Sequence, residues 1–210
     1  MPLTSGLRSA IAVSLLSLAW SGLVGTIAVI EASASGALSL LGFGITALID
    51  AAASVALILR FLLEAGSPRS AELAERRAER TIGIALLALA TYLLVTSARA
   101  VVTGDHPAAD PVGVGLLAGS LVIQPLLGIA KRRLARRIQS PALAADGTLS
   151  LIGGGLAGIG LIGLVAATSL DLLWADAVAA AVVALVAMRE GVESLRLSSA
   201  ARRRRGAARR

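Results

Sequence analysis

Six long apolar segments dominate the sequence, and they decide the environment in which the chain can fold. Each is close to the roughly 20 residues that an α-helix needs to cross about 30 Å of hydrocarbon. The segments cover residues 11–30, 36–59, 81–98, 111–130, 147–170 and 172–188. With 56% hydrophobic residues and a mean hydropathy of +0.83, the chain has too few polar side chains to cover a water-soluble globule. The sequence therefore predicts an all-α, polytopic membrane protein with six transmembrane helices.

Basic residues fall in alternate connections between these segments. Arg8 precedes the first segment, and basic residues follow the second, fourth and sixth segments. After the second they are Arg60, Arg69, Arg76, Arg77 and Arg80, and after the fourth Lys131, Arg132, Arg133, Arg136 and Arg137. After the sixth they are Arg189, Arg196 and Arg202 to Arg205. Because connections rich in Lys and Arg stay in the cytoplasm, we expect a multi-pass protein of the cell membrane with both termini cytoplasmic. The first segment is longer than the apolar core of a secretory signal, so we expect it to remain as a span.

The expected domain organisation is a six-helix transmembrane domain over residues 1–196, followed by a disordered, Arg-rich cytoplasmic tail over residues 197–210. The tail has no pattern of apolar residues that could form a core. Its arginines would lie on anionic lipid, where each contributes about 1 kcal/mol close to the surface.

The basic composition does not indicate a nucleic-acid partner, although the net charge is +7. Binding to single strands would need aromatic side chains for stacking, and aromatic residues make up 2% of the chain. The sequence contains no nucleophile–His pair, Walker loop or His-rich motif, so we do not expect an enzyme or a resident cofactor. It also contains no Cys, which excludes thiolate metal ligands.

Asp50 lies inside the second apolar segment and needs a physical explanation. An ionised carboxylate near the bilayer centre costs on the order of 3 kcal/mol, so this side chain must face protein or water. In one interpretation it binds a cation or carries a proton, aided by Thr46 and Ser54, which share its helical face. In the other it is a protonated carboxyl that hydrogen-bonds a neighbouring helix. The sequence leaves both interpretations open.

The remaining polar residues predict structural roles. Asp146 and Asp176 are expected at the N-termini of the fifth and sixth helices, where a carboxylate complements the helix dipole. Gln124 precedes Pro125 and is expected to satisfy a backbone group that the proline leaves without a partner. His106 lies in a polar connection and is expected to be solvated.

Several short motifs recur in a characteristic order within the six-segment frame. They are Ala19-Trp20-Ser21, Ser39 to Ile45 followed by Leu48-Ile49-Asp50, Lys131 to Arg137 followed by Ala145-Asp146, and Trp174 to Ala180 leading to Arg189-Glu190-Gly191. Together they resemble the transmembrane half of the cation diffusion facilitator family, from the first helix to Gly191. The resemblance implies a proton-coupled exporter of Zn²⁺ or related divalent cations that works as a homodimer in the lipid bilayer.

The resemblance also implies a metal site, built from two polar residues four apart on the second helix and two more on the fifth. The matching positions here are Thr46 and Asp50, then Leu149 and Gly153. Leu and Gly bring no side-chain ligand, so the site is degenerate and its candidate metal residues are Asp50 and Thr46. The nearby donors, including Ser54 and Ser150, are all oxygens, and such a set favours Mg²⁺ or Mn²⁺ over Zn²⁺.

Two function classes remain open from the sequence. One is a divalent cation transporter of the efflux type. The alternative is a non-transporting membrane protein that keeps the fold for assembly or regulation. A hydrated polar cavity around Asp50 would favour the first class, and a dry, close-packed interior the second.

Overall fold

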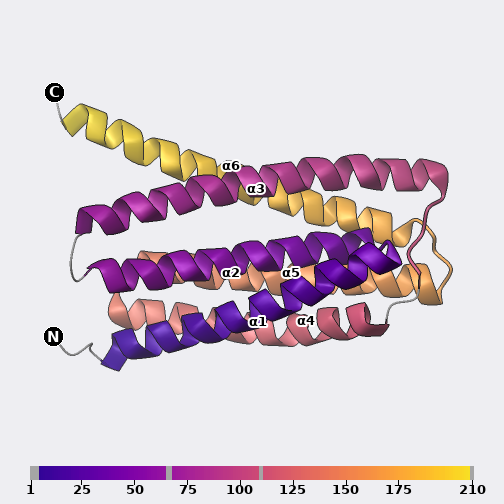
Figure 1. The fold of residues 1–210 in the computed structure, drawn as a ribbon, viewed down its shortest axis with the longest axis horizontal. Coiled ribbons are helices and arrows are strands. Elements are labelled where there is room, and N and C mark those ends of the chain that lie inside the picture. Colours follow the sequence, from indigo (N-terminus) through magenta and orange to yellow (C-terminus); the bar gives the residue numbers. More distant parts are fainter. Residues whose placement is uncertain (1–4, 65–67, 109–110, 209–210) are drawn as a thin grey trace.

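Six long α-helices form an elongated bundle in the computed structural model of the chain (Figure 1). They are α1 (Ser5–Ser35), α2 (Leu38–Glu64), α3 (Pro68–Thr103), α4 (Pro111–Ile138), α5 (Pro141–Ser169) and α6 (Ala175–Ala208). The structure describes residues 5–64, 68–108 and 111–208. The all-α fold class is therefore as the sequence predicts.

Five of the helices are long and apolar enough to cross a membrane. They cover Arg8–Ser35, Leu38–Leu62, Arg80–Thr103, Pro111–Ile138 and Ala142–Ser169, which correspond to the first five expected segments. Within the described residues, α6 does not qualify, because it begins only at Ala175 and Arg189 and Glu190 already follow its apolar part. A polytopic membrane protein is thus confirmed, and the crossing of the membrane by α6 stays a prediction.

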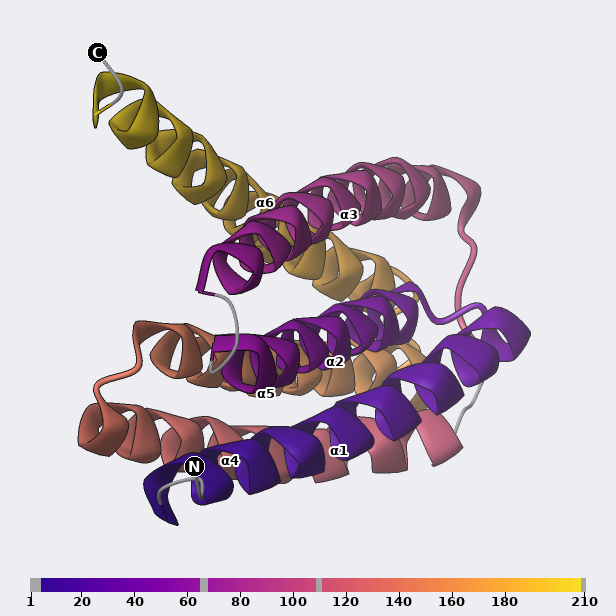
Figure 2. The same ribbon diagram turned by 60° about the vertical axis from the view of Figure 1, so that its left-hand side comes forward.

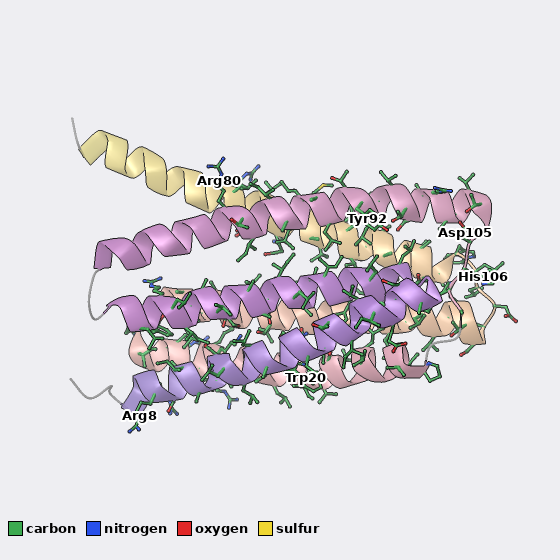
Figure 3. The ribbon with its side chains drawn as sticks, viewed as in Figure 1. Arg8, Trp20, Arg80, Tyr92, Asp105 and His106 are labelled. Atoms are coloured by element: carbon green, nitrogen blue, oxygen red, sulfur yellow. The ribbon has the colours of Figure 1, made fainter. Side chains whose placement is uncertain are left out.

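The outer surface of the bundle is apolar, as a lipid-facing surface must be. Leu16, Val95, Val102, Leu126 and Ile162 are all more than half exposed. Polar residues that are not buried gather at the ends instead, for example Asp105 and His106 in the connection between α3 and α4 (Figure 3). His106 is exposed, in agreement with the solvated role expected for it.

Both termini lie at one end of the bundle (Figure 1). The connections from α2 to α3 and from α4 to α5 are at that same end, and the other three connections are at the opposite end. We refer to the first as the termini end. Every helix therefore runs antiparallel to its neighbours in the chain, and the basic connections of the sequence are collected at the termini end.

The helices extend further than the apolar segments do. α4 continues to Ile138, and α5 begins at Pro141 with Ser140 as its N-cap, whose hydroxyl accepts from the Leu143 N–H at 3.3 Å. α6 runs to Ala208, so the structure differs from the disorder expected after Arg196. The reason is local, because the tail consists largely of Ala and Arg, which are among the strongest helix formers.

Three helix pairs cross at paired glycines. Between α1 and α2, a Cβ on Gly25 would stand 2.9 Å from the Gly44 carbonyl oxygen. Between α4 and α5, a Cβ on Gly128 would stand 2.7 Å from the Gly147 carbonyl oxygen. The third pair, Gly83 of α3 and Gly191 of α6, meets in the same way at 3.0 Å in both directions. These contacts bring the backbones together as small residues do in membrane proteins generally.

Asp176 connects α6 to the beginning of α2. It lies in the first turn of α6 as expected, but its Oδ2 accepts from the Leu38 N–H of α2 at 2.7 Å, and the Ser39 hydroxyl also donates to its carboxylate. Because the first N–H groups of a helix have no partner within that helix, this carboxylate caps α2. The capping role expected for Asp176 is therefore carried out on a different helix.

Candidate functional site

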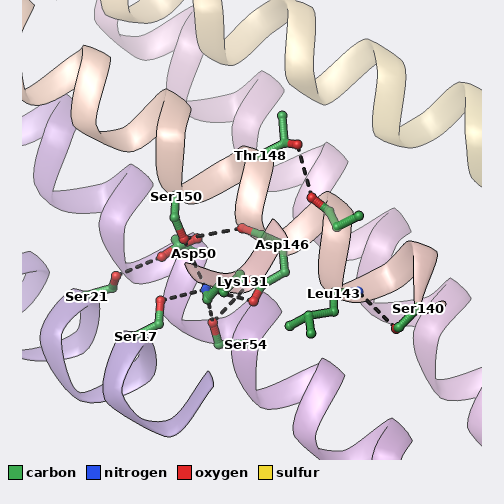
Figure 4. Close-up of polar contacts among 11 residues, drawn as sticks. Ser17, Ser21, Asp50, Ser54, Lys131, Ser140, Leu143, Asp146, Thr148 and Ser150 are labelled. Atoms are coloured by element: carbon green, nitrogen blue, oxygen red, sulfur yellow. Dashed lines mark hydrogen bonds and ion pairs between the residues drawn. The ribbon is translucent and has the colours of Figure 1, made fainter. Parts of the chain in front are cut away.

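A cluster of buried polar side chains lies between α1, α2, α4 and α5 (Figure 4). Its members are Ser17 and Ser21 of α1, Asp50 and Ser54 of α2, Lys131 of α4, and Asp146 and Ser150 of α5. On α1, α2 and α5 the two members are four residues apart, so they lie on one face of their helix. Four helices thus contribute to one shared polar cluster in the interior of the bundle.

Lys131 and Asp146 form the ion pair of this cluster. The Lys131 Nζ is 2.7 Å from the Asp146 Oδ2, and both side chains are at least 95% buried. The ammonium also donates to the hydroxyl oxygens of Ser17 at 2.7 Å, Ser150 at 3.0 Å and Ser54 at 3.4 Å. A buried ion pair is favourable only when further hydrogen bonds satisfy its donors and acceptors, and here three hydroxyls do so.

The positions of these two residues correct the interpretation of the sequence. Lys131 was expected in a cytoplasmic connection, but α4 runs past it and turns it towards α5. Asp146 was expected at a helix N-terminus, but Ser140 caps α5, so Asp146 lies in the second turn and pairs with Lys131 instead. A sequence signal was present, because the buried residues of α4 recur every three or four positions and Lys131 continues that stripe.

Asp50 lies beside the ion pair with part of its carboxylate unused. Its Oδ2 accepts from the Ser21 hydroxyl at 2.8 Å, and its Oδ1 is buried without a hydrogen-bond partner among the described residues. Ser54, one turn further along α2, donates instead to the Asp146 Oδ1 at 3.2 Å. Within the part of the chain that the structure describes, no Lys or Arg forms a salt bridge with Asp50. Its charge is therefore not neutralised by a direct partner.

The four positions that the family resemblance selects lie together in space. Thr46 and Asp50 of α2 and Leu149 and Gly153 of α5 all line a small cavity of about 40 Å³, which residues of α3, α4 and α6 complete. The Thr46 hydroxyl donates to the backbone oxygens of its own helix, at 3.0 Å to Gly42 and 2.8 Å to Phe43. The helix faces meet as the mapping expects, whereas the part that Asp50 and Thr46 play in binding a cation stays a prediction.

Gln124 lines the same cavity, and its expected role was wrong. Neither polar atom of this amide has a hydrogen-bond partner in the described structure, so it does not satisfy a backbone group next to Pro125. The side chain reaches across to α5, where a Cβ on Gly153 would overlap its Oε1. Sequence reasoning missed this residue as a member of the site, because the contact depends on how α4 packs against α5.

A larger cavity of about 390 Å³ is lined by residues of α2, α3, α5 and α6, and Asp146 of the polar cluster is one of them. Its lining includes Arg60, Asp146 and Glu193, and it shares Leu149 and Glu190 with the smaller cavity. Burial raises the pKa of Glu190, Glu193 nearby raises it further, and Arg189 lowers it. Glu190 therefore contributes a carboxyl with a raised pKa to the lining of both cavities.

The site offers one carboxylate oxygen, one amide and hydroxyl oxygens, and no imidazole. Among the described residues, no group of three or more His, Asp or Glu side chains could hold a metal ion together. The arrangement suits a weakly held cation that passes through, and lacks the ligands of a permanent zinc centre.

The ion pair generates a stability prediction. Lys131→Met keeps the length of the side chain but leaves the Asp146 carboxylate buried without its cation, so we expect a loss of about 3–5 kcal/mol in the free energy of unfolding. Arg132→Met, at the exposed neighbouring position, is the matched control and should change little. The double variant Lys131→Met/Asp146→Leu should recover much of the loss, measured by denaturant unfolding in detergent. Equal stability of Lys131→Met and the wild type would contradict the assigned pair.

Comparison with known families identifies the family of this chain, over a region that does not reach α1 or α2 with Asp50 and Thr46. The model of the cation efflux transmembrane domain matches residues 74–201, which is well over half of the chain and includes Lys131, Asp146 and Glu190. No curated protein is significantly similar to the sequence. The matched family consists of membrane transporters and not of enzymes, as the sequence predicts. The chain therefore belongs to the cation efflux family, whose transmembrane domain it contains.

Proposed function

We propose that this protein exports a divalent cation across the cell membrane in exchange for protons, and that the two compete for the carboxylate of Asp50. The observation that carries the proposal is the Asp50 Oδ1, which is buried, has no partner among the described residues and lies beside a cavity. Family membership already implies transport of a cation. The proposal adds the coupling, the charge of the substrate and the residue responsible.

Charge balance supports the choice of Asp50. The cluster contains two carboxylates and one ammonium, and Lys131 offsets Asp146 at 2.7 Å. Asp50 is then the negative charge that still needs a counter-charge, because an unpaired buried charge is strongly unfavourable. A proton on the carboxyl meets this need, and so does a bound cation. Since both cannot occupy the carboxylate fully at once, binding of one favours release of the other.

The chemistry of the donors supports a hard divalent cation. Carboxylate, amide, hydroxyl and water oxygens are the ligands of Mg²⁺ and Mn²⁺, whereas buried zinc sites usually draw on imidazole or thiolate. The chain has no Cys, and its one His, at position 106, is exposed in a connection. We therefore propose Mg²⁺ or Mn²⁺ as the substrate class.

The larger cavity supports entry of the cation from the termini end, past Glu190 and towards Asp50. Two carboxylates of its lining, Glu190 and Glu193, would raise the local concentration of cations.

A second candidate, a non-transporting member of the family, is favoured by two observations. The Lys131 ammonium already supplies a positive charge at the polar centre, and Leu149 and Gly153 bring no ligand to the adjacent cavity. In that case the bundle would serve assembly or regulation. Measurement of transport decides between the two.

We expect Asp50→Asn to slow transport strongly. The amide has the shape of the carboxyl but carries neither the charge nor the exchangeable proton, so Mn²⁺ flux into proteoliposomes driven by a pH gradient should fall by at least tenfold. Asp105→Asn, an identical change in the exposed connection, should leave the flux unaltered. Acidification on the side from which Mn²⁺ is taken up should lower the Mn²⁺ flux of the wild type, because protons then compete with the cation for Asp50. An Asp50→Asn variant with the wild-type rate and pH profile would make Asp50 structural, and a wild type without flux would favour the second candidate.

We further propose that both termini are cytoplasmic and that α6 is a sixth span. The termini share one end of the bundle, and the basic connections lie there too (Figure 2). Because the chain has no Cys, single-cysteine variants can report the topology. An impermeant maleimide should label His106→Cys in intact cells, and Arg137→Cys only after permeabilisation. A C-terminal tag should also be protected; external labelling of this tag would show that α6 does not cross.

We also propose a homodimer, in line with the family resemblance. Cross-linking in native membranes at low expression should capture a species of twice the monomer mass. Consistent recovery of the monomer, under conditions that cross-link a known membrane dimer, would count against this assembly.

A further inference from the structure

Gln124 is a buried polar side chain without an assigned task. It is 1% exposed, and both its Oε1 and its Nε2 are without hydrogen-bond partners among the described residues. Native proteins contain few such groups, because a buried amide that has lost its water contacts and gained no others is unfavourable. A feature with this cost needs a compensating interaction, and a ligand can provide one.

The packing of α4 against α5 holds this amide in one place. A Cβ on Gly153 would overlap the Gln124 Oε1, and a Cβ on Gly154 would stand 2.6 Å from the ring of Pro125. Two consecutive glycines of α5 therefore make room for two consecutive residues of α4. Any side chain at position 153 would displace the amide.

The amide oxygen consequently lies where a side chain from position 153 would begin. This is the position at which the family resemblance expects a ligand and at which the chain has glycine. Position 153 on α5 thus has no side chain, and the polar side chain of Gln124 from α4 occupies the same space.

Two further residues with side-chain oxygens, Asp50 and Thr46, belong to the lining of this largely apolar cavity together with Gln124. The Asp50 Oδ1 has no partner in the described structure, and Asp50 and Thr46 both line the same cavity. Because the Thr46 hydroxyl donates its hydrogen to the carbonyls of Gly42 and Phe43, its lone pairs remain available to a cation. The cavity volume of about 40 Å³ exceeds the minimum needed for one water molecule, so it has room for a small ion.

We propose that Gln124 is a ligand of the transported cation, and that its amide oxygen replaces the ligand missing at Gly153. The substrate-binding set of this protein is then the Asp50 carboxylate, the Gln124 amide oxygen and the Thr46 hydroxyl, completed by water. One carboxylate with neutral oxygens is a hard, weakly charged set, which fits Mg²⁺ or Mn²⁺. This inference rests on the proposed function and assigns the site through a helix, α4, that the family mapping does not use.

The test measures binding of Mn²⁺ alone to the full chain in lipid nanodiscs, from the electron paramagnetic resonance signal of the free ion. Gln124→Leu has a similar volume and removes the oxygen, so the dissociation constant should rise by about tenfold or more. Gln124→Glu adds a second carboxylate and should lower the dissociation constant, because the number of charged ligands sets the affinity for hard cations. Ser120→Ala, one turn earlier on α4 and buried but outside the cavity lining, is the matched control and should bind as the wild type does.

The outcomes separate the two proposals. Wild-type affinity in Gln124→Leu, together with lost binding in Asp50→Asn, would overturn the role of Gln124 and leave the proposed function standing. Absence of Mn²⁺ binding by the wild type would overturn both. If Gln124→Leu does not fold, as judged by its thermal melting and gel filtration, Gln124→Glu decides. A dissociation constant of Gln124→Glu equal to or above that of the wild type would reject Gln124 as a ligand.

Discussion

The ion pair between Lys131 and Asp146 places two opposite charges in the interior of the bundle, where both are buried away from water. Both side chains are buried, and the Lys131 Nζ lies 2.7 Å from the Asp146 Oδ2, so the two charges are in direct contact. Removing either partner would leave a bare charge in an apolar surrounding, which is far more costly than the pair itself is favourable. The pair therefore fixes how α4 faces α5, and the hydroxyls of Ser17 and Ser54 extend this constraint to α1 and α2.

The close packing of α4 and α5 makes this pair possible. Gly128 lies one turn before Lys131, and Gly147 directly follows Asp146. A Cβ on either glycine would come within 3 Å of the carbonyl oxygen of the other. Without side chains the two backbones approach closely, so that the short side chain of Asp146 can contact Lys131. The same interface continues past Gly153 and Gly154, where it receives the side chains of Gln124 and Pro125. One helix contact thus organises both the ion pair and the adjacent cavity.

The polar centre and the cavity have different chemical capacities. The serine-lined pair is internally balanced, since the ammonium of Lys131 meets a carboxylate and three hydroxyls. The cavity beside it has unused oxygens at Asp50 and an unused amide at Gln124. A cation entering the bundle would find its free donors in the cavity, while the ammonium limits how much additional positive charge the neighbourhood accepts. Under the proposed function, the cavity and not the ion pair would therefore supply the ligands of the cation.

The sequence by itself determined the membrane class and the approximate course of the helices, because hydrophobicity over about 20 residues is a local property that needs no knowledge of neighbours. It also identified Asp50 as a residue requiring explanation, since a carboxylate inside an apolar segment is unusual wherever the segment packs. It did not reveal the pair of Lys131 with Asp146 or the place of Gln124 opposite Gly153. Lys131 stands in a run of arginines that are mostly exposed, and only the rotation of α4 against α5 turns this one side chain inward. Tertiary structure decided these contacts, because they join residues of different helices, whose relative rotation depends on the packing of the whole bundle.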